Sequence, residues 1–162
     1  MVRGKPLDIA QELLEAFDRS ARLAEYLVEV LPASLWQAEP PRGEGRTIAA
    51  IVAHMQSLRR GFAKMGGSEP VAQTLDGRSN TQSEAIEALR QSREALLELF
   101  AAAFEQGDAR VKGMPRRTVD MLTYLMQHDA YHRGQIALQA RELGHRLGED
   151  DVMRLWGWKK LP

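Results

Sequence analysis

The chain has 162 residues, 44% of them hydrophobic and 27% charged, which fits a single soluble globular domain over residues 1–162. Its 22 basic and 22 acidic residues balance, so we expect no nucleic-acid partner, because phosphate binding depends on a basic surface. Cysteine is absent, which excludes disulfides, thiolate zinc sites and a cysteine nucleophile. Histidine and carboxylate groups remain as metal ligands.

No segment predicts secretion or membrane insertion. The N-terminal sequence MVRGKPLDIAQELLEAF lacks the continuous apolar stretch of a signal peptide. No uncharged apolar run reaches the roughly 18 residues that a membrane span requires. We therefore expect a cytoplasmic protein without a membrane partner.

Apolar residues recur with a helical rather than an alternating period in four segments. The first begins beside Asp8, which forms a candidate capping box with Gln11, and stops at Pro32. The second begins near Thr47, a good N-cap residue, and ends before the glycines of MGGSEP.

The third and fourth segments have similar boundary signals. The third opens with TQSE, where Thr81 and Glu84 fit a capping box, and runs to Gly107. The fourth starts near Thr118 and ends at Gly144.

The connection between the second and third segments is long. It runs from about Gly66 to Asn80, enough to travel the length of a bundle, so these two helices need not be antiparallel neighbours. The other loops are rich in proline, glycine and charge. The fold class that we predict is all-α: a four-helix bundle with a long crossover between helices two and three.

Two of the four histidines, His128 and His132, lie four residues apart in YLMQHDAYHRGQIALQ. Side chains at positions i and i+4 share one face of a helix, with Cβ atoms about 5–6 Å apart. Two imidazoles at that separation can bind one ion at about 2 Å. Apolar residues on the same face turn the pair toward the core or its rim. Two neutral core histidines satisfied by hydrogen bonds, or a partly exposed pair, are the alternatives.

His54, in IAAIVAHMQSLRR, also lies on the apolar side of its helix. With His128 and His132 it can form a facial set of three nitrogen ligands that leaves the remaining positions to water or substrate. Such an open set is typical of catalytic metal sites. An isolated buried imidazole is the alternative interpretation of His54. Imidazoles suit zinc, nickel, iron and copper alike, so the spacing does not identify the metal.

The sequence HDAYH also has the spacing of the zincin motif, in which two histidines flank a glutamate base. Asp129 takes the glutamate position with a shorter side chain. The only downstream histidine, His145, lies just past Gly144, where the dipole of a helix C-terminus explains it. We therefore do not favour a metalloprotease.

A histidine in the second helix followed by H-x-x-x-H-R-G-Q in the fourth resembles the DinB-like superfamily. This superfamily includes damage-inducible proteins and thiol-dependent S-transferases, among them bacillithiol transferases and mycothiol-dependent isomerases. The resemblance covers most of the chain, because the helix count, the long crossover and the motif order agree. It implies a divalent metal (zinc, nickel or iron) held by His54, His128 and His132, and frequent homodimers. It does not settle the reaction, because fold does not fix function.

Residues next to the histidines are weaker candidates. Asp129 and Gln135 are candidates to orient the ligand imidazoles, as metal-bound histidines require, although a surface position suits them as well. Arg133 is interpreted as solvated, or as holding an acidic group. Gly134 costs about 1 kcal/mol in a helix, which close approach of another helix, or room beside the metal, would explain; a glycine that is merely tolerated is the alternative.

Aromatic residues supply further candidates. Tyr26, Tyr124 and Tyr131 are candidate proton donors, although amphipathic packing is the usual role of tyrosine. We expect Trp156 and Trp158 to cover one end of the bundle or a dimer contact, or to form a substrate wall.

Two functional hypotheses follow. In the first, the protein is a metal-dependent thiol S-transferase or hydrolase acting on a small molecule, and the metal lowers the pKa of a low-molecular-weight thiol or of water. Asp129 and Tyr131 are its weak catalytic candidates. In the second, a dimeric stress-associated protein binds a metal or a small ligand and catalyses nothing.

Overall fold

The computed structural model describes residues 7–69 and 73–162, and the fold in these residues is all-helical, which confirms the predicted class. The four predicted helices are all present: α1 (Ile9–Val30), α3 (Ile48–Met65), α4 (Gln82–Glu105) and α5 (Thr118–Glu142). Three short elements were not predicted: α2 (Ala33–Trp36), η1 (Pro41–Gly43) and α6 (Glu149–Leu155).

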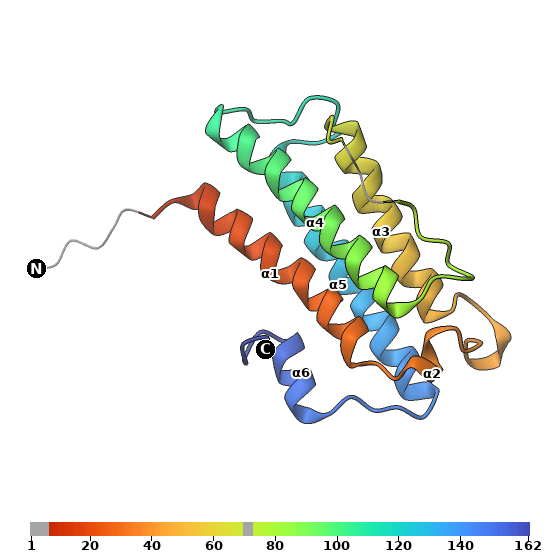
Figure 1. Ribbon diagram of the computed structural model, residues 1–162. Coiled ribbons are helices and arrows are strands. Elements are labelled where there is room, and N and C mark those ends of the chain that lie inside the picture. The colour runs from red at the N-terminus through yellow and green to blue at the C-terminus, as the bar shows by residue number, and fades with distance from the viewer. Residues whose placement is uncertain (1–6, 70–72) are drawn as a thin grey trace, which may run out of the picture.

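The four long helices form a bundle in which α1 and α3 each pack against both α4 and α5 (Figure 1). Helices α3 and α4 run in the same direction, as do α1 and α5. The predicted long crossover makes this arrangement possible, because its described residues 73–81 bring the chain to the start of α3 before α4 begins. Helices α3 and α4 are therefore neighbours, but parallel ones.

Side chains from α2 and α3 hold the end of the crossover. The indole Nε1 of Trp36 donates to the carbonyl oxygen of Asn80 at 2.8 Å. The amide of Gln56 donates to the carbonyl of Gln73 at 2.9 Å. At Gly77, an added Cβ would lie 2.9 Å from Cα of Ala50, so the crossover lies directly on α3.

The N-caps follow the sequence signals with one difference. Thr81 and Glu84 form the full capping box, and Thr47 caps α3 with its side chain. Asp8 accepts from the backbone N–H of Gln11 at 3.1 Å, but the Gln11 side chain bonds to a glutamate one turn later. The capping box predicted at Asp8 is therefore only half formed.

The interior consists of two apolar clusters with a polar layer between them. One cluster fills the bundle around Leu27 and Ile136, and the other fills it around Phe17 and Phe100. Fully buried polar side chains lie between the clusters, among them Arg59, Ser92 and Asp129. Nδ1 of His128 lies 3.9 Å from Oδ1 of Asp129, so the polar layer borders the candidate site.

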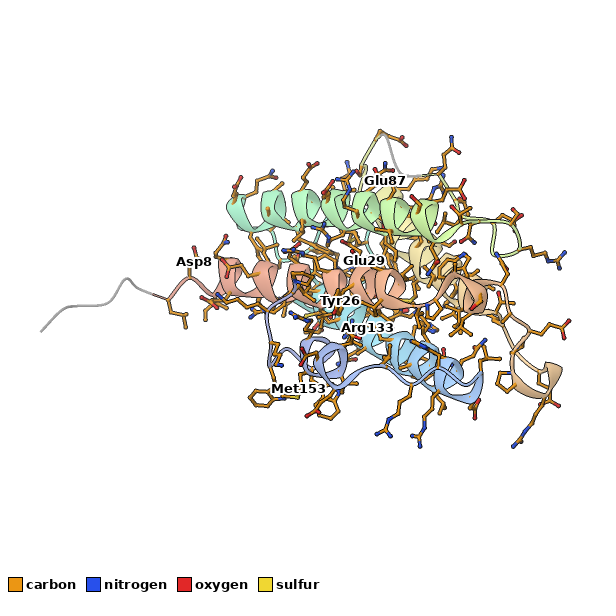
Figure 2. All side chains as sticks on the ribbon, turned by 60° about the horizontal axis from the view of Figure 1, so that its bottom comes forward. Asp8, Tyr26, Glu29, Glu87, Arg133 and Met153 are labelled. Carbon is orange, nitrogen blue, oxygen red and sulfur yellow. The ribbon has the colours of Figure 1, made fainter. Side chains whose placement is uncertain are left out.

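The C-terminal helix α6 packs on α1, where the hydroxyl of Tyr26 donates to Asp151 at 2.6 Å (Figure 2). Trp156 and Trp158 follow this helix and are 70% and 76% exposed. The expectation that they cover one end of the bundle is therefore wrong, because α6 turns them toward solvent. Their role in a dimer contact or a substrate wall stays a prediction. None of the helices in residues 7–69 and 73–162 has the length and apolarity needed to cross a membrane.

Replacing Gly113 by alanine should destabilise the loop between α4 and α5. Gly113 has φ +88°, and an added Cβ would lie 2.2 Å from the carbonyl oxygen of Met65. Gly107 is a matched control, because its φ is +71° but a Cβ there meets nothing within 4 Å. Gly107→Ala should lower the free energy of unfolding by about 1–2 kcal/mol, because of the left-handed backbone alone. Gly113→Ala should lower it clearly more, because of the added clash. Urea unfolding of both variants measures the difference; equal losses would contradict the predicted clash.

Candidate metal centre

Helices α3 and α5 are antiparallel neighbours, and their contact brings His54, His128 and His132 together. Nε2 of His128 lies 3.2 Å from Nε2 of His54 and 3.1 Å from Nε2 of His132. Each histidine thus offers one nitrogen, and all three nitrogens lie within 4.8 Å of one another. Among the described residues, this is the one group of three or more histidine, cysteine or acidic side chains with metal-binding spacing. The group could hold a metal ion.

The spacing of the nitrogens fits a shared ion. Nitrogens about 2.0–2.1 Å from one ion are about 3.3 Å apart in a tetrahedral set and about 2.9 Å apart when adjacent in an octahedral set. The two distances from Nε2 of His128, 3.1 and 3.2 Å, lie between these values, and the nitrogens of His54 and His132 lie within 4.8 Å of each other. Without an ion, Nε2 of His128 carries only one in-plane proton or lone pair for two neighbouring nitrogens. A cation at the centre of the group satisfies all three nitrogens at once.

The surroundings favour the neutral imidazoles that a metal requires. Burial lowers the pKa of His54, and the charges of His132, Arg46 and His128 lower it further. Burial also lowers the pKa of His132, and this outweighs the opposing effect of its hydrogen bond to Gln135.

Gln135 fixes the orientation of one imidazole. Its Oε1 lies 2.7 Å from Nδ1 of His132, and because a carbonyl oxygen only accepts, Nδ1 carries the proton. The lone pair of a neutral His132 is then on Nε2, the atom that faces His128. The amide of Gln135 donates to the hydroxyl of Tyr131 at 3.2 Å. Gln135 is exposed, as one of the two predictions for it had it, and it also orients a histidine of the cluster, as the other had it.

Replacing Gln135 by alanine should weaken zinc binding about 10–100-fold, the usual loss when a hydrogen bond to a ligand histidine is removed. The fold should be unaffected, because the side chain is exposed. Competition with a chromogenic chelator measures the affinity. Gln91→Ala is the control, since Gln91 is an exposed glutamine on α4 bonded to Glu87. An unchanged affinity in Gln135→Ala would contradict the assigned contact.

Asp129 is fully buried and its carboxylate is held by a residue that the sequence analysis did not identify. Oδ2 of Asp129 lies 2.5 Å from Nη2 of Arg59, and both side chains are at most 1% exposed. Burial alone raises the pKa of Asp129, but the positive charge of Arg59 and hydrogen bonding outweigh it, so the pKa is lowered. The available signal was an arginine on the apolar face of α3, four residues after Met55.

A family model described as the DinB family matches residues 5–159. The chain belongs to the DinB family. The resemblance drawn from the histidine motifs is thereby confirmed. No curated protein and no solved structure matches the chain.

Beside the histidines, this DinB family protein has an open pocket of about 500 Å³. His132 forms part of its wall, so the candidate centre borders a space large enough for a small molecule. The pocket lies between the 40–46 loop and α5, and its polar lining residues are Glu44, Arg46, Tyr131, Gln135, Gln139 and Glu142.

The other aromatic and basic candidates of the DinB family protein lie in different surroundings. Tyr131 is 65% exposed and lines the pocket, whereas Tyr26 bonds to Asp151 away from it. The ring of Tyr124 lies 5.9 Å from that of His128, under the guanidinium of Arg116.

Two neighbours of the histidines depart from the sequence interpretation. Arg133 is half-buried and not simply a solvated surface side chain, because it donates to the backbone carbonyl of Ser20 at 2.8 Å. An added Cβ at Gly134 would meet nothing within 4 Å, so close helix approach does not explain this glycine. It lines a groove between α5 and α6.

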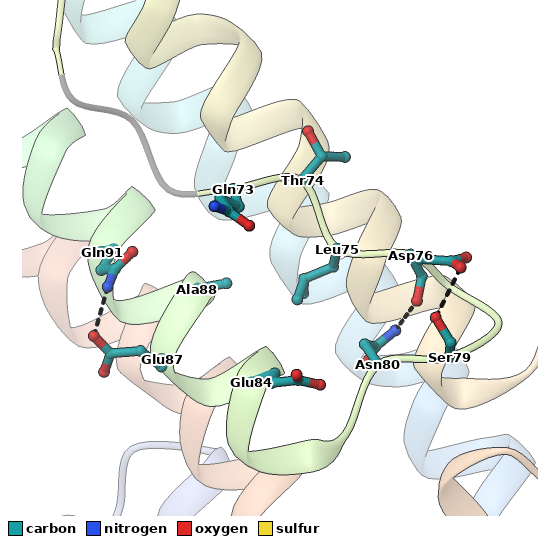
Figure 3. A pocket seen from close by; sticks show the side chains of 10 residues that line it. All are labelled: Gln73, Thr74, Leu75, Asp76, Ser79, Asn80, Glu84, Glu87, Ala88 and Gln91. Carbon is teal, nitrogen blue, oxygen red and sulfur yellow. Dashed lines mark hydrogen bonds between the residues drawn. The ribbon is translucent and has the colours of Figure 1, made fainter.

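A second pocket, of about 390 Å³, lies between the crossover and α4 (Figure 3). Its acidic groups are occupied by local contacts: Asp76 accepts from Ser79, and Glu87 accepts from Gln91. None of the three clustered histidines lines it. We therefore place the candidate chemistry at the histidines.

Proposed function

We propose that this DinB family protein is a metal-dependent enzyme acting on a small molecule, with His54, His128 and His132 as the metal ligands. Thiol S-transfer is the activity that we favour, and hydrolysis is the other. The observation that carries the proposal is the meeting of three Nε2 atoms, 3.1 and 3.2 Å from neighbour to neighbour, in a group whose member His132 lines an open pocket. A buried structural site would not need that opening.

A divalent metal, when bound, supplies Lewis acidity that lowers the pKa of a thiol or of water. The chain itself has no cysteine, so any sulfur nucleophile comes from a separate low-molecular-weight thiol. Arg46 brings positive charge to the pocket, and Tyr131 brings a hydroxyl that can hold a proton there. Asp129 is less suited to move protons, because its carboxylate is buried against Arg59.

The burial of Asp129 also gives weight to the second candidate, a non-catalytic protein that binds a metal or a small ligand. In either case we propose a homodimer in the cytoplasm, as expected from the sequence. The two candidates differ in turnover, because only the enzyme converts a substrate.

A turnover screen separates them. The protein, purified without a histidine tag and loaded with zinc, nickel or iron, is mixed with cellular thiols and a fluorogenic electrophile, and in parallel with an ester. We expect thiol consumption that requires the metal and is lost in His128→Ala. Metal-loaded protein that turns over neither substrate class would contradict the enzyme and favour the binding protein.

A further inference from the structure

Arg59 connects all four long helices at the polar layer. From α3, its guanidinium pairs with Asp129 of α5 and donates to the carbonyl oxygens of Leu89 on α4, at 3.4 Å, and of Ala21 on α1, at 3.5 Å. The side chain is fully buried. Because its partners belong to the three other helices, the position of its guanidinium, and of the carboxylate bound to it, is set by the bundle.

Among the described residues, three buried atoms of this pair and of the adjacent His128 lack a hydrogen-bond partner: Nε of Arg59, Oδ1 of Asp129 and Nδ1 of His128. Oδ1 of Asp129 and Nδ1 of His128 lie 3.9 Å apart, which is too far for a hydrogen bond, but a shift of about 1 Å would form one. Buried polar atoms are nearly always paired in folded proteins. Arg59 binds the other oxygen of Asp129, so Oδ1 remains free to accept a proton from the neighbouring ring.

We propose that the Arg59–Asp129 pair positions His128 for metal binding, by holding a carboxylate oxygen where it accepts the Nδ1–H of His128. This inference rests on the proposed role of His128 as a ligand. A neutral imidazole protonated at Nδ1 has its lone pair on Nε2, the atom that faces His54 and His132. Arg59 acts through Asp129 and is a positioning residue.

The two ligands on α5 are then oriented in the same way, each by an acceptor behind the ring that binds its Nδ1–H. Gln135 lies 2.7 Å from Nδ1 of His132 on the solvent side, and Asp129, 3.9 Å from Nδ1 of His128 on the core side, takes the corresponding role in the proposal. Each contact leaves an Nε2 lone pair aimed at the common centre. Metal-bound histidines are commonly oriented in this way by a carboxylate or an amide behind the ring.

Two double variants test the proposal: Arg59→Met with Asp129→Asn, and Arg59→Met with Asp129→Leu. Both remove the buried ion pair, so neither leaves a buried charge unpaired. Asparagine keeps an oxygen that can accept from His128, whereas leucine, of similar size, does not. Ring ¹⁵N chemical shifts of the metal-free protein report the tautomer of His128, and chelator competition reports zinc affinity.

We expect the Nδ1–H tautomer of His128 in the wild type and in the asparagine variant. In the leucine variant that preference should be lost, and zinc affinity should fall about 10–100-fold. Gln135→Ala is the control, because it should change the tautomer of His132 and leave that of His128 unchanged.

Two results would overturn the inference: an Nε2–H tautomer of His128 in the wild type, or equal tautomers and affinities in the two double variants. The second result would show that the pair is only structural. If the leucine variant does not fold, the tautomer of His128 in the wild type still tests the inference. Absence of zinc binding in the wild type would overturn the proposed function, whereas the tautomer of metal-free His128 would still test the positioning.

Discussion

Replacing Arg59 alone by methionine should lower the free energy of unfolding by about 3–5 kcal/mol, the usual cost of removing one partner from a buried ion pair. The substitution leaves the carboxylate of Asp129 in the core at 1% exposure, where water cannot take the place of the guanidinium. The backbone carbonyls of Leu89 and Ala21 would lose a donor as well. Guanidinium chloride unfolding, followed by circular dichroism, measures the loss.

Arg90→Met is the matched control, because Arg90 also pairs with carboxylates, Glu87 and Glu94, but on the surface of α4. Exposed pairs contribute little to stability, since water solvates both charges when the pair is broken. The Arg90→Met variant should have a free energy of unfolding close to that of the wild type. Similar losses in Arg59→Met and Arg90→Met would contradict the assignment of Arg59 to a buried, bundle-wide contact.

The stability of Arg59→Met should also depend on pH, and the direction follows from Asp129. In the wild type the pKa of Asp129 is lowered, so its pairing contributes stability above the pKa of an unfolded aspartate and loses it as pH falls through the folded value. Without Arg59, burial, which is the largest influence and raises the pKa of this carboxyl, is opposed only by the interaction with His128 and the charge of Arg133. The variant should therefore lose less stability than the wild type on acidification, because protonation removes its unpaired charge.

The helices were predictable because their information is local. A period of 3.6 residues marks an apolar face, and Thr47, Thr81 and Glu84 satisfy backbone N–H groups within their own first turn. The turn α2 and the seven-residue α6 were missed, since neither is long enough to show a period. Trp156 and Trp158 were misplaced for the same reason: α6, which turns them outward, was not foreseen.

The histidines of the candidate site were predictable from the sequence, but Arg59, which holds Asp129 behind them, was not. The spacing of His128 and His132 is a property of one helix, and His54 was added from its place on the apolar side of another. The resemblance to the DinB-like superfamily then implied that all three are ligands. Arg59 carried no comparable signal, because an arginine on an apolar face normally reaches solvent. Its burial depends on Asp129, 70 residues away in the chain, and so on the packing of α3 against α5.

Metal should stabilise the wild type, and removal of any one clustered histidine should abolish that effect. A ligand that binds only the folded state at 100 times its Kd raises the free energy of unfolding by about 2.7 kcal/mol. We therefore expect a gain of that order for the wild type with zinc in such excess, and almost none for His54→Ala, His128→Ala or His132→Ala. Loss of a ligand should reduce affinity beyond the roughly 10–100-fold cost of losing a supporting contact.

His145→Ala provides the control, because His145 is the fourth histidine of the chain and lies outside the cluster. It should bind one equivalent of metal and gain the same stability as the wild type. Elemental analysis of untagged protein and urea unfolding with and without zinc measure content and stabilisation. If His128→Ala kept the full gain, or if His145→Ala lost it, the metal would be bound elsewhere, and the meeting of the three Nε2 atoms would be a feature of packing alone.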